Sequence, residues 1–469
     1  LGLDIEVSQK NTVLVVCPTL ARFMGASIFG QQGKPIPIRF HKMHRDFNVL
    51  RFIGRGCYSL VFEARHTEGP DTDKSYALKR FFLQNSSAVN CALRERRLLE
   101  KLALEPTQSP FLPTLFYSFM VNDGPVFLLR EGTGCDLFDL LHTNGLLSES
   151  QSRFYVSEII CGLEHLHSLG IVHLDLKPEN VLMCPTGHVF ISDFDRSYDL
   201  TQSTKRPTDD DFTGTPLFMA PEIAKGDVIT TKADVWSLGV LMAEMVCGPI
   251  RPVAKDLAED LRWAKEGRYT IRRLKSLTKP LQAFFSTCLQ RKYQQRPELA
   301  VVRQLRFFKY VDWDQVRSNS LTPPISTSLL KHRPNREAIC KLNPTDPLLL
   351  ASAYASEMPI TRKKLCQVVH NQGDSSPRLA TEPPDLEDLA AASMTKDALA
   401  KMFADFTFVH PSLRRSIKPT DGSSELFSQS AKPPSSPVDE NSNGLDSTIS
   451  VEDPKPYLRK RNRKCSAGD

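Results

Sequence analysis

The sequence lacks any arrangement of cysteines that would support a disulfide framework or a zinc site. Its 11 cysteines are odd in number and scattered along the chain, and no Cys-x-x-Cys pair occurs. Small secreted domains depend on paired cysteines and structural zinc sites on closely spaced ligands, so the sequence argues against both classes. We therefore expect a reducing intracellular compartment and a cytoplasmic protein.

Long hydrophobic runs are also missing. The apolar run at residues 12–17 is interrupted by Pro18 and Arg22, whereas a membrane-spanning helix needs about 20 consecutive apolar residues. We therefore expect neither a secretory signal nor a membrane partner.

The chain has little excess charge of either sign. Its formal net charge is +6, from 60 basic and 54 acidic residues, and the charges are spread along the sequence, so we expect no nucleic-acid partner. A basic cluster at residues 455–464 is either a nuclear-import signal or a solvated basic tail. The first alternative adds a nuclear location to the cytoplasmic one.

The composition predicts one packed region with loose ends. The 469 residues are 41% hydrophobic, which suffices for a two-lobed core but not for packing throughout. Residues 316–400 are rich in Pro, Ser and charged residues and residues 409–469 in Ser, Pro and basic residues, so we expect disorder there. Residues 1–46 carry no domain signature, and we expect a monomer.

The most informative segment is residues 173–180 (HLDLKPEN), followed closely by Asp193. Such a segment can gather a base, a cation and two metal ligands around one phosphoryl group. In this reading Asp175 orients and deprotonates a substrate hydroxyl, Lys177 lies against the transferred phosphate, and Asn180 and Asp193 hold Mg²⁺. A polar turn between strands would be the alternative explanation.

Residues 53–61 (IGRGCYSLV) lie between alternating segments, which predicts a hairpin folded over phosphates. Taken alone, a Gly-x-Gly turn is an ordinary hairpin. Its position strengthens the argument, because Lys79 follows on a strand-like run and Glu95 lies in a helical stretch. A lysine on the phosphates of ATP can then be clamped by a carboxylate.

In this order, the motifs resemble those of the eukaryotic protein kinase family over about residues 47–308. Further matches are residues 220–222 (APE), residues 234–239 (DVWSLG), and Arg296 as the expected partner of Glu222. The resemblance implies an α+β, two-lobed fold, with a small antiparallel-sheet lobe at about 47–131 and a larger, mainly helical lobe at about 132–308. It also implies ATP and Mg²⁺ as cofactors. The residues that it implies for ATP binding are Ile53, Gly54, Arg55, Gly56, Cys57, Tyr58, Ser59, Leu60, Val61, Ala77, Lys79, Glu95, Glu131 and Asp136.

A finer resemblance follows the domain. Residues 307–313 (FFKYVDW) and 403–408 (FADFTF) look like the tail and hydrophobic motif of the AGC group, and are most similar to the ribosomal S-six kinase branch. The resemblance implies an AGC-type tail over residues 309–408, with two Phe side chains docked beside the helix that carries Glu95. It also implies an upstream kinase that phosphorylates Thr407.

Several residues depart from the family pattern. Leu174 replaces an Arg that binds a loop phosphate, and Asp211 falls near the position that relatives phosphorylate. Asp211 therefore suggests either a built-in negative charge or a loop released from that control. Asp195 replaces the glycine of the metal-binding turn and brings a charge near Mg²⁺. Arg130 falls where an apolar residue normally borders the adenine, so it turns outward or the register shifts by one.

Catalysis remains the favoured function, since Lys79, Glu95, Asp175, Asn180 and Asp193 are all present. The alternative is a pseudokinase that binds nucleotide or acts as a scaffold. Residues 175–180 (DLKPEN) favour Ser/Thr over Tyr as acceptor. The resemblance also aligns Asp136, Glu179 and Glu244 with carboxylates that bind substrate arginines, which implies protein substrates with basic residues near the target.

Overall fold

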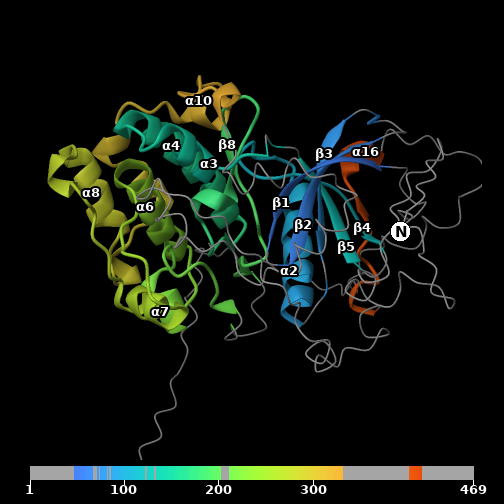
Figure 1. The fold of residues 1–469 in the computed structure, drawn as a ribbon, viewed down its shortest axis with the longest axis horizontal. Coiled ribbons are helices and arrows are strands. Elements are labelled where there is room, and N and C mark those ends of the chain that lie inside the picture. Colours follow the sequence, from blue (N-terminus) through green and yellow to red (C-terminus); the bar gives the residue numbers. More distant parts are fainter. Residues whose placement is uncertain are drawn as a thin grey trace, which may run out of the picture.

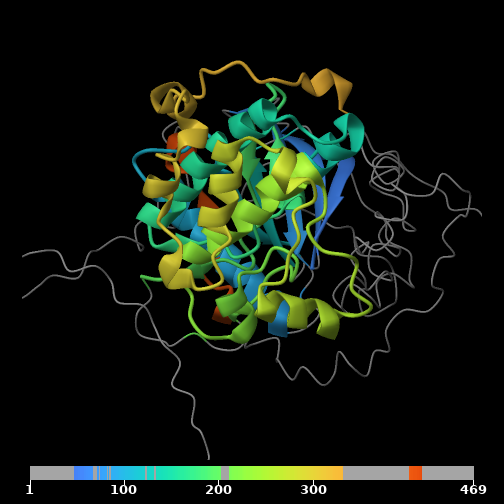
Figure 2. The same ribbon diagram turned by 90° about the vertical axis from the view of Figure 1, so that its left-hand side faces the viewer.

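The structure is a computed structural model. It describes residues 47–330, apart from 57, 67–70, 73, 82, 84–85, 122–123, 131, 133, 202–206 and 208–210, together with residues 401–414. The chain forms two lobes, a sheet lobe with one long helix and a larger helical lobe (Figure 1). Turned by 90°, the helices of the larger lobe lie in front of the sheet (Figure 2).

The small lobe is an antiparallel sheet flanked by the long helix α2. Its strands alternate side chains between a buried and a more exposed face, as in β2, where Leu60, Phe62 and Ala64 are buried at every second position. The strand order is β1-β2-β3-β5-β4-β10. The elements are β1 (Phe47–Arg55), β2 (Ser59–His66), β3 (Ser75–Phe81), α2 (Ser86–Leu104), β4 (Leu115–Val121) and β5 (Gly124–Arg130).

The sixth strand of this sheet comes from the end of the described chain. Strand β10 (Phe408–Val409) pairs with β4, with Phe408 opposite Ser118 and Val409 opposite Tyr117. The N–H of His410 donates to the carbonyl of Phe116 at 2.8 Å and extends this pairing by one bond. Helix α16 (Pro411–Arg414) follows. A segment far away in sequence therefore completes the small lobe (Figure 1).

The large lobe is built around α6, which is buried along most of its length. Residues 233–245 of this helix are all buried, as expected for a helix that is packed on every side. The other helices are α3 (Leu137–Asn144), α4 (Glu149–Ser168), α5 (Pro221–Lys225), α6 (Lys232–Cys247), α7 (Leu257–Glu266), α8 (Lys279–Cys288), α9 (Leu299–Val302) and α10 (Trp313–Arg317).

Short two-stranded sheets present the catalytic segments at the junction of the lobes. Strand β6 (Ile171–Val172) pairs with β9 (Tyr198–Asp199), and β7 (Val181–Met183) pairs with β8 (Val189–Ile191). Residues 173–180 follow β6, and residues 192–195 follow β8. Both β6 and β8 are fully buried, which anchors the polar segments that follow them.

The two-lobed fold is confirmed, as is the pairing of Arg296 with Glu222, whose side chains form a buried ion pair. Residues 1–46, 331–400 and 415–469 lie outside the described residues, and so do the predictions made for them. The domain boundaries stay predictions. Within the described part of the chain, no helix combines the length and apolar character needed to cross a lipid bilayer.

Candidate active site

The first group of site residues joins the two lobes. Lys79 on β3 donates to both carboxylate oxygens of Glu95 on α2, at 2.9 and 2.7 Å. The same ammonium lies 2.8 Å from Oδ1 of Asp193, which follows β8 in the large lobe. Burial lowers the pKa of Lys79, but the carboxylates of Asp193 and Glu95 outweigh it and raise the pKa above its usual value. The ammonium is therefore charged.

Asp193 is the member of this group that the large lobe contributes. Burial by itself raises the pKa of a carboxyl, but the ammonium of Lys79 lowers the pKa of Asp193 to about 2. The residue also has a positive φ of 69°, a conformation that costs little for Asp compared with most side chains. The backbone thus holds an ionised carboxylate at the junction of the lobes.

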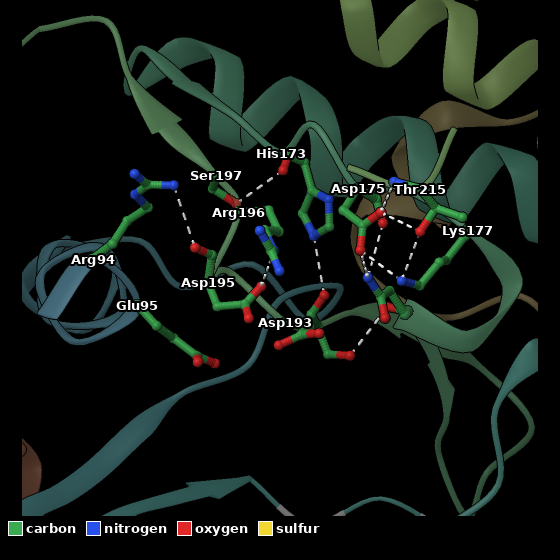
Figure 3. A network of polar contacts seen from close by, with 12 residues as sticks. Arg94, Glu95, His173, Asp175, Lys177, Asp193, Asp195, Arg196, Ser197 and Thr215 are labelled. Atoms are coloured by element: carbon green, nitrogen blue, oxygen red, sulfur yellow. Dashed lines mark hydrogen bonds and ion pairs between the residues drawn. The ribbon is translucent and has the colours of Figure 1, made fainter. Parts of the chain in front are cut away.

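The second group surrounds the predicted base, Asp175 (Figure 3). Lys177 Nζ lies 2.6 Å from Oδ2 of Asp175. Thr215 donates to Oδ1 through both its main-chain N–H and its hydroxyl, each at 2.7 Å. Asn180 Nδ2 donates to the main-chain oxygen of Asp175 at 2.8 Å. Asp175 as a whole residue is 5% exposed. Its side chain is therefore enclosed, and these contacts fix its orientation.

A buried aspartate on α6, Asp234, anchors the backbone of the catalytic loop. Asp234 accepts the main-chain N–H groups of His173 and Leu174 at 2.8 and 2.9 Å, and its Oδ2 lies 2.8 Å from His167 Nε2. Leu174 has a positive φ of 65°. These bonds compensate for a backbone conformation that Leu rarely adopts, and the loop can then present Asp175 to the cleft.

The donor set fits a magnesium site. Asp193 and Asn180 offer hard oxygen ligands, and Asn180 uses its amide nitrogen on Asp175, which leaves its Oδ1 for a cation. In the described part of the chain no three His, Cys, Asp or Glu residues are grouped to hold a metal by themselves. Mg²⁺ commonly binds through one or two protein ligands, with water and substrate phosphates completing its coordination.

The glycine-rich segment forms the predicted hairpin between β1 and β2. The N–H of Gly56 donates to the carbonyl of Ser59 at 2.8 Å and closes the turn. Ser59, which stands at the third glycine position, is buried. Pairing of β2 with β3 places Val61 opposite Lys79. The hairpin is therefore in register with the lysine that the sequence assigned to ATP.

The remaining nucleotide residues differ in how far the structure describes them. Gly54 and Leu60 lie in the β1–β2 pair, Ile53 and Leu60 are buried, and Tyr58 and Ala77 are half-buried. The side chain of Arg55 lies outside the described residues, as do Cys57 and Glu131. The structure therefore describes most of the predicted hairpin, whereas the role of Glu131 in ATP binding stays a prediction.

Two predicted residues occupy positions with other partners. Arg130 packs against other parts of the chain, because its Nη1 donates to the carbonyl of Pro110 at 3.0 Å and its guanidinium lies over the Phe190 ring. Asp136 caps α3, where its Oδ1 accepts the N–H of Asp139 at 2.8 Å. Asp136 is 1% exposed, so its contact with nucleotide stays a prediction.

Asp195 brings a second carboxylate beside the metal-binding turn. The residue is 8% exposed, and its Oδ1 lies 3.8 Å from Arg196 Nε. Burial, and then the charge of Asp193, raise the pKa of Asp195 to about 6. A glycine at this position would contribute neither the charge nor the burial cost.

The hydrophobic motif docks beside α2, as the resemblance implied. Phe403, Phe406 and Phe408 are each at most 5% exposed, and the Phe406 ring stacks on Phe127 with centroids 5.5 Å apart. Arg96 Nε donates to the carbonyl of Phe406 at 3.2 Å and its guanidinium lies over two of these rings. The side chain of Thr407 is exposed.

Sequence reasoning missed three residues of this site. Thr215 contacts both Asp175 and Lys177, the latter at 3.0 Å. The other two are Arg94 and Arg96, on either side of Glu95 in α2. The signal for them was weak, because an exposed-looking Arg next to a functional Glu does not reveal which distant carbonyl or carboxylate it meets.

Comparisons with known proteins agree with this geometry. The protein kinase domain family model matches residues 47–308, and the chain belongs to the protein kinase family. It is 31% identical over 291 residues to putative ribosomal protein S6 kinase alpha-1 of Caenorhabditis elegans, covering 61% of this chain and 36% of the relative. It is 30% identical over 302 residues to ribosomal protein S6 kinase alpha-6 of Homo sapiens, covering 62% and 40%.

These values confirm the resemblance to ribosomal S6 kinases of the AGC group. The chain spans about two fifths of the length of these relatives or less. What the relatives do as whole proteins therefore reaches this chain only as a proposal.

Proposed function

We propose that the chain is an ATP- and Mg²⁺-dependent protein serine/threonine kinase. The observation that carries the proposal is the convergence of Lys79, Glu95 and Asp193 in one group, with Asp175 and Asn180 in the adjoining one. Each of the five has a different part in phosphoryl transfer. Their convergence supplies the complete set of polar groups that the reaction requires.

When bound, magnesium ATP supplies the γ-phosphoryl group. The carboxylate of Asp175 orients the Ser or Thr hydroxyl and accepts its proton as the new O–P bond forms and the bond to ADP breaks. Lys177, charged because the carboxylate of Asp175 raises its pKa despite burial, stabilises the transferred group. Lys79, held by Glu95, would bind the α- and β-phosphates, and Asn180 and Asp193 would hold the metal.

The position of Thr215 supports the assignment of Asp175 as the base. Two donors on Oδ1 and an ammonium on Oδ2 hold the carboxylate in one orientation. Fixing the geometry of a catalytic group before reaction is a main source of rate enhancement when little covalent chemistry is required of the protein.

The decisive experiment is transfer of labelled phosphate to a peptide substrate by wild type and Asp175→Asn. We expect Asp175→Asn to lower kcat by about 10²–10⁴-fold, the range for a general base. Asp314→Asn, on the exposed surface of α10, is the matched control and should leave the rate unchanged. Transfer at the wild-type rate by Asp175→Asn would refute the role given to this residue.

A pseudokinase is the alternative that one observation favours. The buried carboxylate of Asp195 beside Asp193 adds negative charge where relatives have none, which alters metal binding. Thermal denaturation with ATP distinguishes the alternatives, because a ligand that binds the folded state raises the melting temperature. Stabilisation by ATP that needs Mg²⁺, together with turnover, supports the enzyme; partner binding indifferent to Lys79→Met and no turnover supports the scaffold.

For the substrate class we propose proteins with basic residues near the target Ser or Thr. The support is chemical, since carboxylates pair with arginine in a bidentate manner. Glu179 is half-buried and Glu244 is buried on α6. Peptide-array profiling tests the idea, and equal rates on arginine-rich and arginine-free peptides would remove it.

We also propose that Thr407 is a target of an upstream kinase, that the protein is a monomer, and that it is cytoplasmic, with a nuclear location as well if residues 455–464 act as an import signal. The exposed side chain of Thr407 between two buried Phe residues supports the first point. Residues 455–464 support the nuclear location by sequence alone. Deleting residues 455–469 tests that location, and unchanged localisation would argue for a solvated tail.

A further inference from the structure

Helix α2 makes a second polar contact next to the clamp glutamate. Arg94 precedes Glu95, and its Nη2 donates to Oδ1 of Asp211 at 2.9 Å. Its Nη1 lies 3.5 Å from the main-chain oxygen of Asp195 (Figure 3). One guanidinium therefore joins α2 both to the metal-binding turn and to the loop that leads to Thr215.

The segment from Asp211 to Thr215 is held at both ends. Arg94 binds one end, and the bonds between Thr215 and Asp175 bind the other. Between them Gly214 has a φ of +135°, and a Cβ there would lie 2.6 Å from the carbonyl oxygen of Leu174. Only glycine permits this approach. A few residues thus connect the helix of Glu95 to the base.

The catalytic loop supplies no cation at position 174. The side chain of Leu174 is apolar and 3% exposed, packed in the core. The carboxylate of Asp211 is instead met by Arg94, from the opposite lobe. The cation that meets this loop at Asp211 is therefore on α2 and not at position 174 of the catalytic loop.

We propose that Arg94 is a positioning residue for phosphoryl transfer, and that the Arg94–Asp211 ion pair couples α2 to the catalytic loop without a phosphate on the loop. The proposal rests on the kinase activity proposed above and concerns the regulation of that same site. Arg94 acts through Glu95 on one side and Thr215 on the other. Since Asp211 is an encoded carboxylate, the coupling is present as soon as the protein folds.

The surroundings of the pair make it stronger than an ordinary surface contact. The two side chains are 19% and 18% exposed, so solvent and salt screen their attraction less than on an open surface. Arginine presents several N–H groups in a rigid fork, which suits two acceptors at once. Lysine keeps the charge but offers no such fork.

The test is a double-mutant cycle on the full chain after phosphatase treatment, with intact mass confirming that no phosphate remains. The cycle comprises Arg94→Met, Asp211→Asn and the double variant. We expect each single change to lower kcat by about ten-fold, the range of a coupled pair. The double variant should be no worse than either single one, and the KM for the peptide should stay unchanged.

Further variants separate positioning from stability. Arg94→Lys should be intermediate, and exchange of the two charges (Arg94→Asp with Asp211→Arg) should recover part of the lost kcat. The matched control is the exposed pair of Arg317 and Asp314, 2.6 Å apart on α10, whose neutralisation should leave kcat unchanged. If Arg94→Met melts well below wild type, the charge-exchanged variant decides: recovery supports the proposal, and a folded variant without recovery contradicts it.

Two outcomes overturn the inference alone, namely additive effects of the two single changes, or a loss of wild-type activity on phosphatase treatment that renewed phosphorylation of Thr407 does not reverse. Failure of the proposed kinase function has another signature. Wild type would then transfer no more phosphate than Asp175→Asn before phosphatase treatment as well as after it. The two failures are thus distinguished in one experiment.

Discussion

The two halves of the site differ in how closely they follow the kinase pattern. On the acceptor side Asp175, Lys177 and Asn180 match it and are tied together at 3.1 Å or less. On the nucleotide side Asp195 and Arg130 depart from it. A base acts only on the atom that it touches, whereas nucleotide affinity is a sum over many contacts. The acceptor side, where one residue must act on one atom, therefore follows the kinase pattern more closely than the nucleotide side does.

The strongest test of this comparison is Thr215→Val on the acceptor side. The change removes the hydroxyl that contacts Asp175 and Lys177 while keeping the shape. We expect kcat to fall by about 10²-fold, because a misplaced catalytic group costs this much, with little change in the KM for ATP. Thr287→Val on α8, whose hydroxyl bonds only within its helix, is the control. A small loss in kcat would show that the acceptor side tolerates change too.

The docked tail gives the next largest effect. Phe406→Ala removes a ring that is 3% exposed and stacked on Phe127. Loss of this burial should weaken docking of the tail by about 1.5–3 kcal/mol. It should also loosen α2, because the guanidinium of Arg96 loses its contact with the Phe406 ring. Hydrogen exchange of α2 measures this loosening, and Phe285→Ala on α8, which removes a similarly buried ring of the large lobe, is the control. Unchanged exchange in α2 would separate the tail from the clamp helix.

Restoring the family residue on the nucleotide side should have a smaller effect. Asp195→Gly removes a buried carboxylate beside Asp193. We expect the Mg²⁺ concentration for half-maximal activity to change by roughly three- to ten-fold, equal to about 1 kcal/mol, and kcat to change less. Kinetics at varied Mg²⁺ with fixed ATP provide the measurement. A change in kcat as large as that of Thr215→Val would erase the distinction between the two sides.

The last expected effect is on the stability of the fold. The pKa of Asp195 is raised to about 6 from an ordinary value of 3.8, so between these pH values the folded state holds a proton that the unfolded state has lost. Wild type should therefore gain stability relative to Asp195→Asn as pH falls from about 7 to 4, by an amount on the order of 1–3 kcal/mol. Urea denaturation at both pH values checks this, and parallel curves would contradict it.

Local sequence patterns predicted the parts of the site that lie in short motifs. The contacts of Lys79 with Glu95 and Asp193 needed only the order of the motifs and the chemistry of their side chains. The contacts of Arg94 with Asp211 and of Arg96 with Phe406 could not be predicted, because each pairs residues far apart in sequence. The direction of Arg130 was also open, since a side chain at the hinge is placed by packing against Pro110 and Phe190.

Strand β10 has a consequence for handling the protein. It covers the edge of β4, whose N–H and C=O groups would otherwise be unpaired. Open sheet edges recruit strands from other molecules. A version of the chain ending before residue 401 should therefore self-associate through this edge, and the tail serves as an internal guard against aggregation as well as a support for α2.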